Sequence, residues 1–156
     1  DNSYSRRELM KYLVGAIALA ASCLAQAGSQ EEELSDNILA MQNAYAAFAS
    51  GDMEAWKAEH SSDVTWTILE GLPYSGTYQG KDAIIENVFS QIADLWPDFS
   101  VEPISFYESG DKVFIHVKIS IDGKQTEALH MSTMKDGKQV AFTPFENSAF
   151  MMQMLE

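Results

Sequence analysis

Four strand-like segments separated by short turns dominate the last third of the chain, and they limit the possible folds more than any other feature. Residues 100–107, 112–121, 125–134 and 139–145 are rich in β-branched and aromatic side chains. The turns between them read Ser109-Gly110-Asp111, Asp122-Gly123 and Asp136-Gly137. Aspartate–glycine pairs accept the positive backbone angles of tight hairpins, so the four segments are predicted to form an antiparallel meander.

Helical patterns precede this meander. Apolar residues recur at helical spacing over residues 34–48, after a capping-box sequence at residues 29–32 and before Gly51. Asp52 is predicted to cap a second, short helix that ends near Ser61, and a third helix is expected from Gly80 to Trp96-Pro97. A bent strand at residues 64–69 and a short helix at residues 149–155 complete the pattern. This order predicts an α+β fold in which helices cover one face of a curved sheet.

The order and spacing of four motifs resemble the NTF2-like superfamily, specifically its SnoaL-like branch, which is related to polyketide cyclases and ketosteroid isomerases. The motifs are Phe48-Ala-Ser-Gly-Asp52, the turn at residues 73–80, the helix stop at residues 96–99 and the hairpin at residues 136–140. The resemblance implies a cone of three helices packed on a strongly curved, mostly antiparallel sheet, with an apolar pocket. It also implies a homodimer formed through the outer sheet face. Function does not follow, because this fold carries several activities and also proteins without one.

The resemblance selects two candidate site positions, a histidine before the last hairpin and an acid near the end of the strand after it. His130 and Asn147 occupy them. An amide takes no proton at ordinary pH, although it orients a ligand through hydrogen bonds. Asn147 is equally suited to capping the last short helix. Glu146 is adjacent, and strand alternation is expected to point it to the opposite face.

Aromatic residues fit a pocket lining beside these two positions. A histidine among small and apolar side chains is often only structural, so His130 is a tentative catalytic residue. The remaining ligand-binding candidates are Tyr45, Trp66, Tyr74, Phe89 and Phe145, together with Asn147. No metal-ligand spacing, phosphate loop or dinucleotide fingerprint is present, so neither a metal nor another cofactor is expected.

Three functions therefore stay open at the level of sequence. The favoured one is a pocket protein that binds a small, mostly apolar molecule, with catalysis in doubt because Asn147 replaces the acid. The alternative is a cofactor-independent isomerase, cyclase or hydratase that uses His130 as acid or base. The third is a non-catalytic dimeric interaction module. A net charge of −13 argues against nucleic acid as a partner.

The beginning of the chain predicts export. Ser5-Arg6-Arg7-Glu8-Leu9-Met10-Lys11 resembles a twin-arginine signal, and an apolar run at residues 12–24 follows it. That run spans about 20 Å as a helix, too short for a hydrocarbon core of about 30 Å, so no stable membrane span is expected after processing. Cleavage is expected after Ala25-Gln26-Ala27, with lipidation at Cys23 as the rival outcome. The prediction is thus a signal peptide at residues 1–27 and one domain at residues 28–156 that is periplasmic or otherwise exported.

Overall fold

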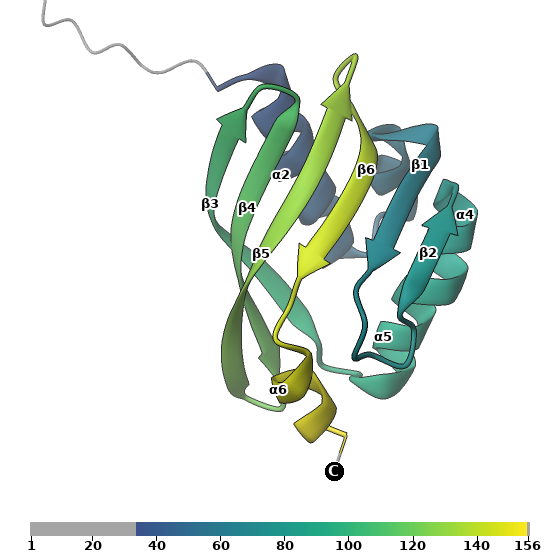
Figure 1. Ribbon diagram of the computed structural model, residues 1–156, viewed down its shortest axis with the longest axis vertical. Coiled ribbons are helices and arrows are strands. Elements are labelled where there is room, and N and C mark those ends of the chain that lie inside the picture. The colour runs from purple at the N-terminus through teal and green to yellow at the C-terminus, as the bar shows by residue number, and fades with distance from the viewer. Residues whose placement is uncertain (1–33, 156) are drawn as a thin grey trace, which may run out of the picture. The chain divides into compact units, whose positions relative to one another are not determined.

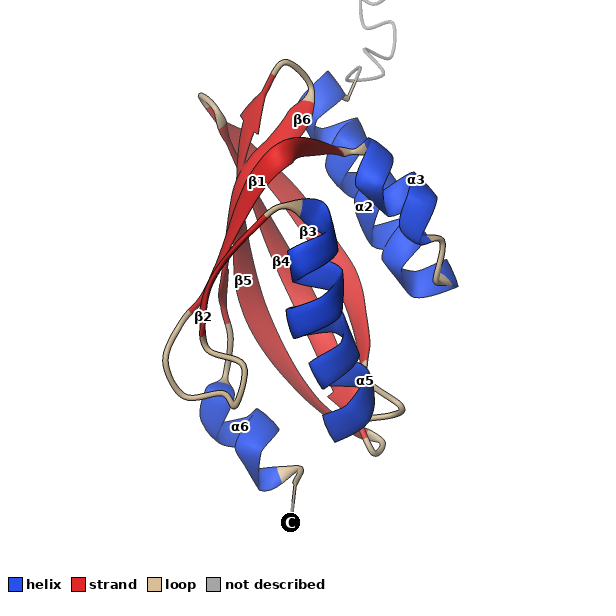
Figure 2. Ribbon diagram, turned by 90° about the vertical axis from the view of Figure 1, so that its right-hand side faces the viewer, coloured by secondary structure: helices blue, strands red, loops and turns tan. Residues whose placement is uncertain are grey.

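A six-stranded sheet forms one layer of the molecule, and helices cover one of its faces (Figures 1 and 2). The computed structural model describes residues 34–155, so the predicted signal peptide and the capping box at residues 29–32 lie outside the described part. The predicted meander is present as β3 (Ser100–Ser109), β4 (Lys112–Ile121), β5 (Lys124–Lys135) and β6 (Lys138–Phe145).

Two earlier strands extend the sheet beyond the meander. They are β1 (His60–Ile68) and β2 (Gly76–Gln79), and the strand order is β2-β1-β6-β5-β4-β3. β1 runs parallel to β6, whereas the other neighbouring pairs are antiparallel. The sheet is therefore mixed but mostly antiparallel, as the sequence predicted.

Two short-range caps define the first pair of helices. The Ser35 hydroxyl accepts a hydrogen bond from the Ile38 amide at 3.1 Å at the start of α2 (Asp36–Ser50), and Gly51, with φ of 73°, ends that helix. Asp52 caps α3 (Met53–Ala58) by accepting from the Ala55 amide at 3.0 Å. This helix ends before the predicted position because β1 already begins at His60.

The third helical segment is continuous but changes its geometry in the middle. It consists of α4 (Lys81–Ile84), the π-helical turn η1 (Ile85–Phe89) and α5 (Ser90–Leu95). π-Helical turns are rare and occur often at functional sites. A last short helix, α6 (Ser148–Gln153), follows β6 and lies near the carboxyl terminus (Figure 1).

One extra residue in β6 changes which side chains face the helices. Thr133 pairs with Ala141 and Met134 pairs with Gln139, so Val140 is left without a partner in the register. Such a β-bulge shifts the alternation of side chains by one residue. Gln139 is buried before the bulge, and Phe142 and Pro144 are buried after it.

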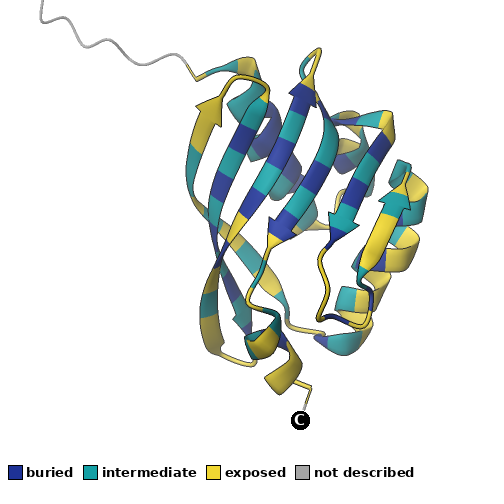
Figure 3. Ribbon diagram, viewed as in Figure 1, coloured by how far each residue is buried: buried dark blue, intermediate teal, exposed yellow. Residues whose placement is uncertain are grey.

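The core lies between the sheet and the helices. Buried and less buried residues alternate along β4, which places Val113, Ile115, Val117 and Ile119 on the helix-facing side (Figure 3). Met41 of α2, Ile84 of α4 and Val88 of η1 pack against this surface as fully buried side chains. Within residues 34–155, no helix has the length and apolarity needed to cross a membrane.

Candidate functional site

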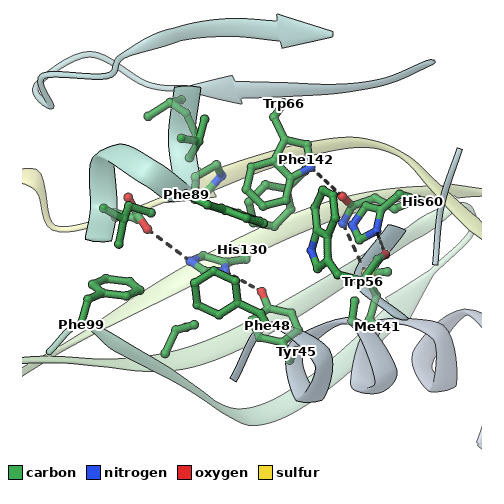
Figure 4. Close-up of a pocket in the computed structure, with 18 of the residues that line it drawn as sticks. Met41, Tyr45, Phe48, Trp56, His60, Trp66, Phe89, Phe99, His130 and Phe142 are labelled. Atoms are coloured by element: carbon green, nitrogen blue, oxygen red, sulfur yellow. Dashed lines mark hydrogen bonds and ion pairs between the residues drawn. The ribbon is translucent and has the colours of Figure 1, made fainter. Parts of the chain in front are cut away.

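An aromatic cavity of about 70 Å³ lies between the helices and the inner face of the sheet. Its walls come from α2, α3, η1, α5, the strands β1, β3, β5 and β6, and the turn between β1 and β2. The aromatic side chains form a connected set, in which Trp66 lies 4.2 Å from Phe142 and 5.4 Å from Phe89 between ring centroids. Figure 4 shows His130 and Tyr45 among these rings. The cavity therefore suits a flat, mostly apolar molecule.

His130 brings a titratable group into this apolar space. It lies on β5 between Ile115 and Pro144, and it is 5% exposed. Its Nδ1 atom lies 2.5 Å from the hydroxyl oxygen of Tyr45, which reaches it from α2 (Figure 4). This short contact fixes the orientation of the imidazole ring.

Glu146 lies on the other side of the imidazole. Its Oε1 atom is 3.6 Å from His130 Nε2, and its side chain is only 11% exposed. Among the described residues, His130 Nε2 has no partner within hydrogen-bond distance, so Glu146 is its nearest charged neighbour. A carboxylate and an imidazole nitrogen thus face each other inside the cavity without a hydrogen bond between them.

The protonation state of Tyr45 determines which nitrogen of the His130 imidazole carries the proton. Burial, and to a smaller extent the negative charge of Glu146, raises the pKa of Tyr45 well above its usual value. Tyr45 therefore keeps its proton, and its hydroxyl donates a hydrogen bond to His130 Nδ1. In the neutral imidazole the ring N–H must then be on Nε2, where it points toward Glu146.

The structure separates the residues predicted for the site into two groups. His130, Tyr45, Trp66, Tyr74 and Phe89 all line the cavity. Phe145 is instead 46% exposed and lies outside this cavity. Asn147 also lies outside it: its side-chain Oδ1 accepts from the Phe150 amide, and its side-chain Nδ2 donates to the Thr126 hydroxyl.

The expectation that Asn147 faces the pocket and Glu146 faces away is therefore corrected. Unbroken alternation from the buried Gln139 would turn positions 145 and 147 inward. The bulge at Val140 reverses this order, so Phe142, Pro144 and Glu146 face the cavity. The sequence offers one weak signal of irregular pairing here, namely Pro144 in an interior strand.

A second polar group in the cavity wall was missed at the level of sequence. His60 at the start of β1 is stacked on Trp56 with ring centroids 3.8 Å apart, and its Nδ1 donates to the Trp56 carbonyl at 2.6 Å. Burial lowers the pKa of His60 to about 4, so the ring is neutral at pH 7. Gln139 lies nearby and accepts from Trp66 Nε1 at 2.8 Å. These bonds indicate a structural role for His60.

Comparison with known proteins agrees with this architecture. The sequence profile of the SnoaL-like domain matches residues 41–143. The structure is similar to that of TerC co-crystallized with polyporic acid, with 27% identity, a TM-score of 0.70, and coverage of 78% of this chain and 100% of TerC. No curated protein matches the chain in sequence.

Two NTF2-like proteins from Burkholderia are also similar in structure. One, of unknown function, is from Burkholderia pseudomallei (24% identity, TM-score 0.69, 78% of this chain and 98% of that chain). The other is from Burkholderia thailandensis (25% identity, TM-score 0.67, 79% of this chain and 99% of that chain). The fold predicted from the sequence is confirmed, and the chain belongs to the SnoaL-like domain family, within the NTF2-like fold.

Proposed function

We propose that this protein catalyses cofactor-independent proton transfer on a small, mostly apolar molecule, an isomerase- or cyclase-type reaction. The observation that supports this proposal most strongly is the Glu146 carboxylate, which lies 3.6 Å from His130 Nε2 in an aromatic cavity. The loss of an acid at Asn147 was the reason to doubt catalysis. Glu146 supplies a carboxylate in the cavity and removes that reason.

The geometry suggests a distinct role for each polar side chain. Glu146 is the base that takes a proton from the ligand, because it is the carboxylate that lines the cavity. His130 presents its Nε2–H beside the carboxylate and is the group that donates a hydrogen bond or a proton. Tyr45 acts through His130 by holding the ring in one orientation. Nothing is oxidised when a proton leaves one ligand atom and another atom is protonated.

The lining supports an apolar ligand. Phe48, Trp56 and Phe142 contribute ring faces and edges to the cavity, and few polar atoms join them. TerC, which is 27% identical, was co-crystallized with polyporic acid, which supports a small organic ligand for this chain too. The proposed substrates are therefore small cyclic or aromatic compounds with an acidic C–H or O–H group.

Deuterium exchange tests this function without knowledge of the natural product. The purified protein is incubated in D₂O with a panel of cyclic ketones such as 1-indanone and 2-tetralone, and loss of the proton signals beside the carbonyl is followed by NMR. We expect the wild type to accelerate exchange above the buffer rate. Glu146→Gln should lower that acceleration at least a hundredfold, since a general base typically contributes about 10²–10⁴-fold.

Asn147→Ala is the matched control, because it removes the adjacent side chain that lies outside the cavity. It should exchange within about twofold of the wild type if its effect is confined to helix capping. Equal rates for wild type and Glu146→Gln would contradict the assignment. Ligand binding without any acceleration would favour the alternative, a non-catalytic binding protein.

We also propose that the protein forms a homodimer through the outer face of the sheet. Leu129 and Phe145 lie opposite each other on that face and are 41% and 46% exposed. Phe114 and Met131 form the next pair along the same face. Leu129→Glu should shift the protein from dimer to monomer in sedimentation equilibrium, whereas an unchanged mass would argue against this interface.

Export through the twin-arginine route is the proposed cellular fate of the chain. Its test is fractionation of bacteria that express the full chain, with mass spectrometry of the product. Replacing Arg6 and Arg7 with lysines keeps the charge and should still block export. Unimpeded export of that variant would point to the general route, and a Cys23→Ser variant that loses a lipid mass would indicate lipoprotein processing.

A further inference from the structure

Tyr74 is a buried side chain in a rigid exposed turn. The turn joins β1 to β2, and Tyr74 is 4% exposed although Leu69 and Gly71 nearby are exposed. Ser75 holds the turn by accepting from the Leu72 amide at 3.0 Å and donating to the Leu69 carbonyl at 2.6 Å. Tyr78 adds a hydrogen bond from its hydroxyl to the Tyr74 carbonyl at 2.8 Å. The backbone of Tyr74 is thus fixed on both sides.

The hydroxyl of Tyr74 is an unpaired donor. Tyr74 lines the cavity, but within residues 34–155 its buried hydroxyl has no hydrogen-bond partner. A buried polar group without a partner destabilises the folded state, so such groups are rare in folded proteins and call for an explanation. Trp96 packs edge-on against the ring at 6.3 Å between centroids and also has an unpaired buried N–H among the described residues.

The electrostatic surroundings determine what this hydroxyl can bind. Burial raises the pKa of Tyr74, and the negative charge of Glu146 raises it further. The phenol therefore keeps its proton and acts as a donor. The same carboxylate disfavours a second negative charge in the cavity, so the acceptor must arrive as a neutral group.

We propose that Tyr74 is the specificity-determining donor of the site and that its hydroxyl binds the carbonyl oxygen of a neutral, mostly apolar ketone. What happens to the carbonyl during the reaction rests on the proposed function. The binding contact itself is inferred from the unpaired hydroxyl of Tyr74. It names the substrate class, which the apolar lining by itself leaves open.

The contact also fits the proposed proton transfer. When Glu146 takes a proton from the carbon beside the carbonyl, the electron pair of the C–H bond forms the new C=C bond, and the carbonyl π electrons move to oxygen. The Tyr74 O–H group donates to the resulting enolate oxygen without giving up its proton. Because a hydrogen bond to a charged oxygen is stronger than one to a neutral oxygen, Tyr74 stabilises the enolate more than the ketone.

The test uses the full chain and two probes of nearly the same shape, 1-indanone and indane, titrated by NMR. The wild type should bind 1-indanone several-fold more tightly than indane. Tyr74→Phe should weaken the binding of 1-indanone about five- to tenfold and leave indane unchanged, since one net hydrogen bond is lost. A wild type with no preference for 1-indanone, or a variant that retains the preference, would overturn the proposal.

Stability of the free protein gives an independent readout. Tyr74→Phe should unfold at the same or a higher temperature than the wild type, because it removes an unpaired buried hydroxyl. Tyr78→Phe is the matched control and should unfold at a lower temperature, because it loses the bond to the Tyr74 carbonyl. If the unfolding temperature falls equally in both variants, the Tyr74 hydroxyl has a hydrogen-bond partner within the protein. That result would contradict its role as a free donor for the ligand. Loss of exchange activity in Glu146→Gln tests the base separately from this binding contact.

Discussion

The Glu146 carboxylate lies 3.6 Å from Nε2 of His130, and the two residues reach this position from different segments. His130 is in the middle of β5, while Glu146 follows the last residue of β6. Pro144, the partner of His130 in the register, precedes Glu146 by two residues on the same face. The pairing therefore depends on the bulge at Val140 earlier in β6.

Deletion of Val140 tests whether the bulge accommodates this one extra residue. Without Val140, Ala141 follows Gln139 directly, so regular alternation keeps Gln139, Phe142, Pro144 and Glu146 on the inner face. We expect the deletion variant to unfold cooperatively, with an unfolding free energy within about 1–2 kcal/mol of the wild type, because no fully buried side chain is lost.

Val140→Ala keeps the residue count and is the control for the deletion. Since Val140 is only partly buried, this substitution should cost about 1 kcal/mol or less. Urea unfolding followed by near-ultraviolet circular dichroism compares the two variants. A deletion variant that loses cooperative unfolding while Val140→Ala retains it would contradict the position of the bulge.

Tyr45→Phe should affect the state of His130 rather than the shape of the cavity. It removes the donor 2.5 Å from Nδ1 and leaves a buried nitrogen unpaired, so unfolding free energy should fall by about 1–3 kcal/mol. The proton on the ring is no longer restricted to Nε2, which nitrogen-15 NMR of the imidazole detects. Tyr107→Phe, on a ring that is 60% exposed, should change stability by less than about 0.5 kcal/mol.

His60 should make stability depend on pH. Its pKa is lowered by burial to about 4 in the folded state, against about 6.5 when unfolded. Between these values the unfolded chain binds more protons, so unfolding free energy falls as the pH falls from about 6.5 to 4, by on the order of 3 kcal/mol in total.

Urea unfolding at several pH values checks this expectation. His60→Gln should lose this part of the pH dependence. His116→Gln, a substitution on the outer sheet face, retains His60 and should retain the slope. If the unfolding free energy of His60→Gln depends on pH as strongly as that of the wild type, groups other than His60 cause the pH dependence.

Asn147→Ala should weaken the last helix without changing the cavity. The side-chain Oδ1 of Asn147 accepts from the Phe150 amide at 3.1 Å at the start of α6. Loss of such a cap typically costs about 1 kcal/mol, which thermal unfolding measures. A substantial change in 1-indanone affinity would contradict the position of Asn147 outside the site.

Local sequence rules were sufficient for the fold class and for most elements, although β2 lies within the segment that was predicted to be a turn. Turn signals such as Asp122-Gly123 and Asp136-Gly137 separated the strands of the meander, and both aspartates adopt the positive φ angles that these turns require. Asp52 and Gly51 marked the helix boundaries that the structure contains. These features depend on residues close in sequence, so the sequence alone specified them.

The site could not be predicted from the sequence alone, because the pairing between strands decides which residues of β6 face the cavity. A bulge is a mismatch between two strands, and nothing within β6 alone fixes where the extra residue is accommodated. The pattern therefore identified His130 and the aromatic lining but selected Asn147 and Phe145 in place of Glu146. Only the packed sheet determined that Glu146 faces His130 inside the cavity and that the Tyr74 hydroxyl is buried without a partner among residues 34–155.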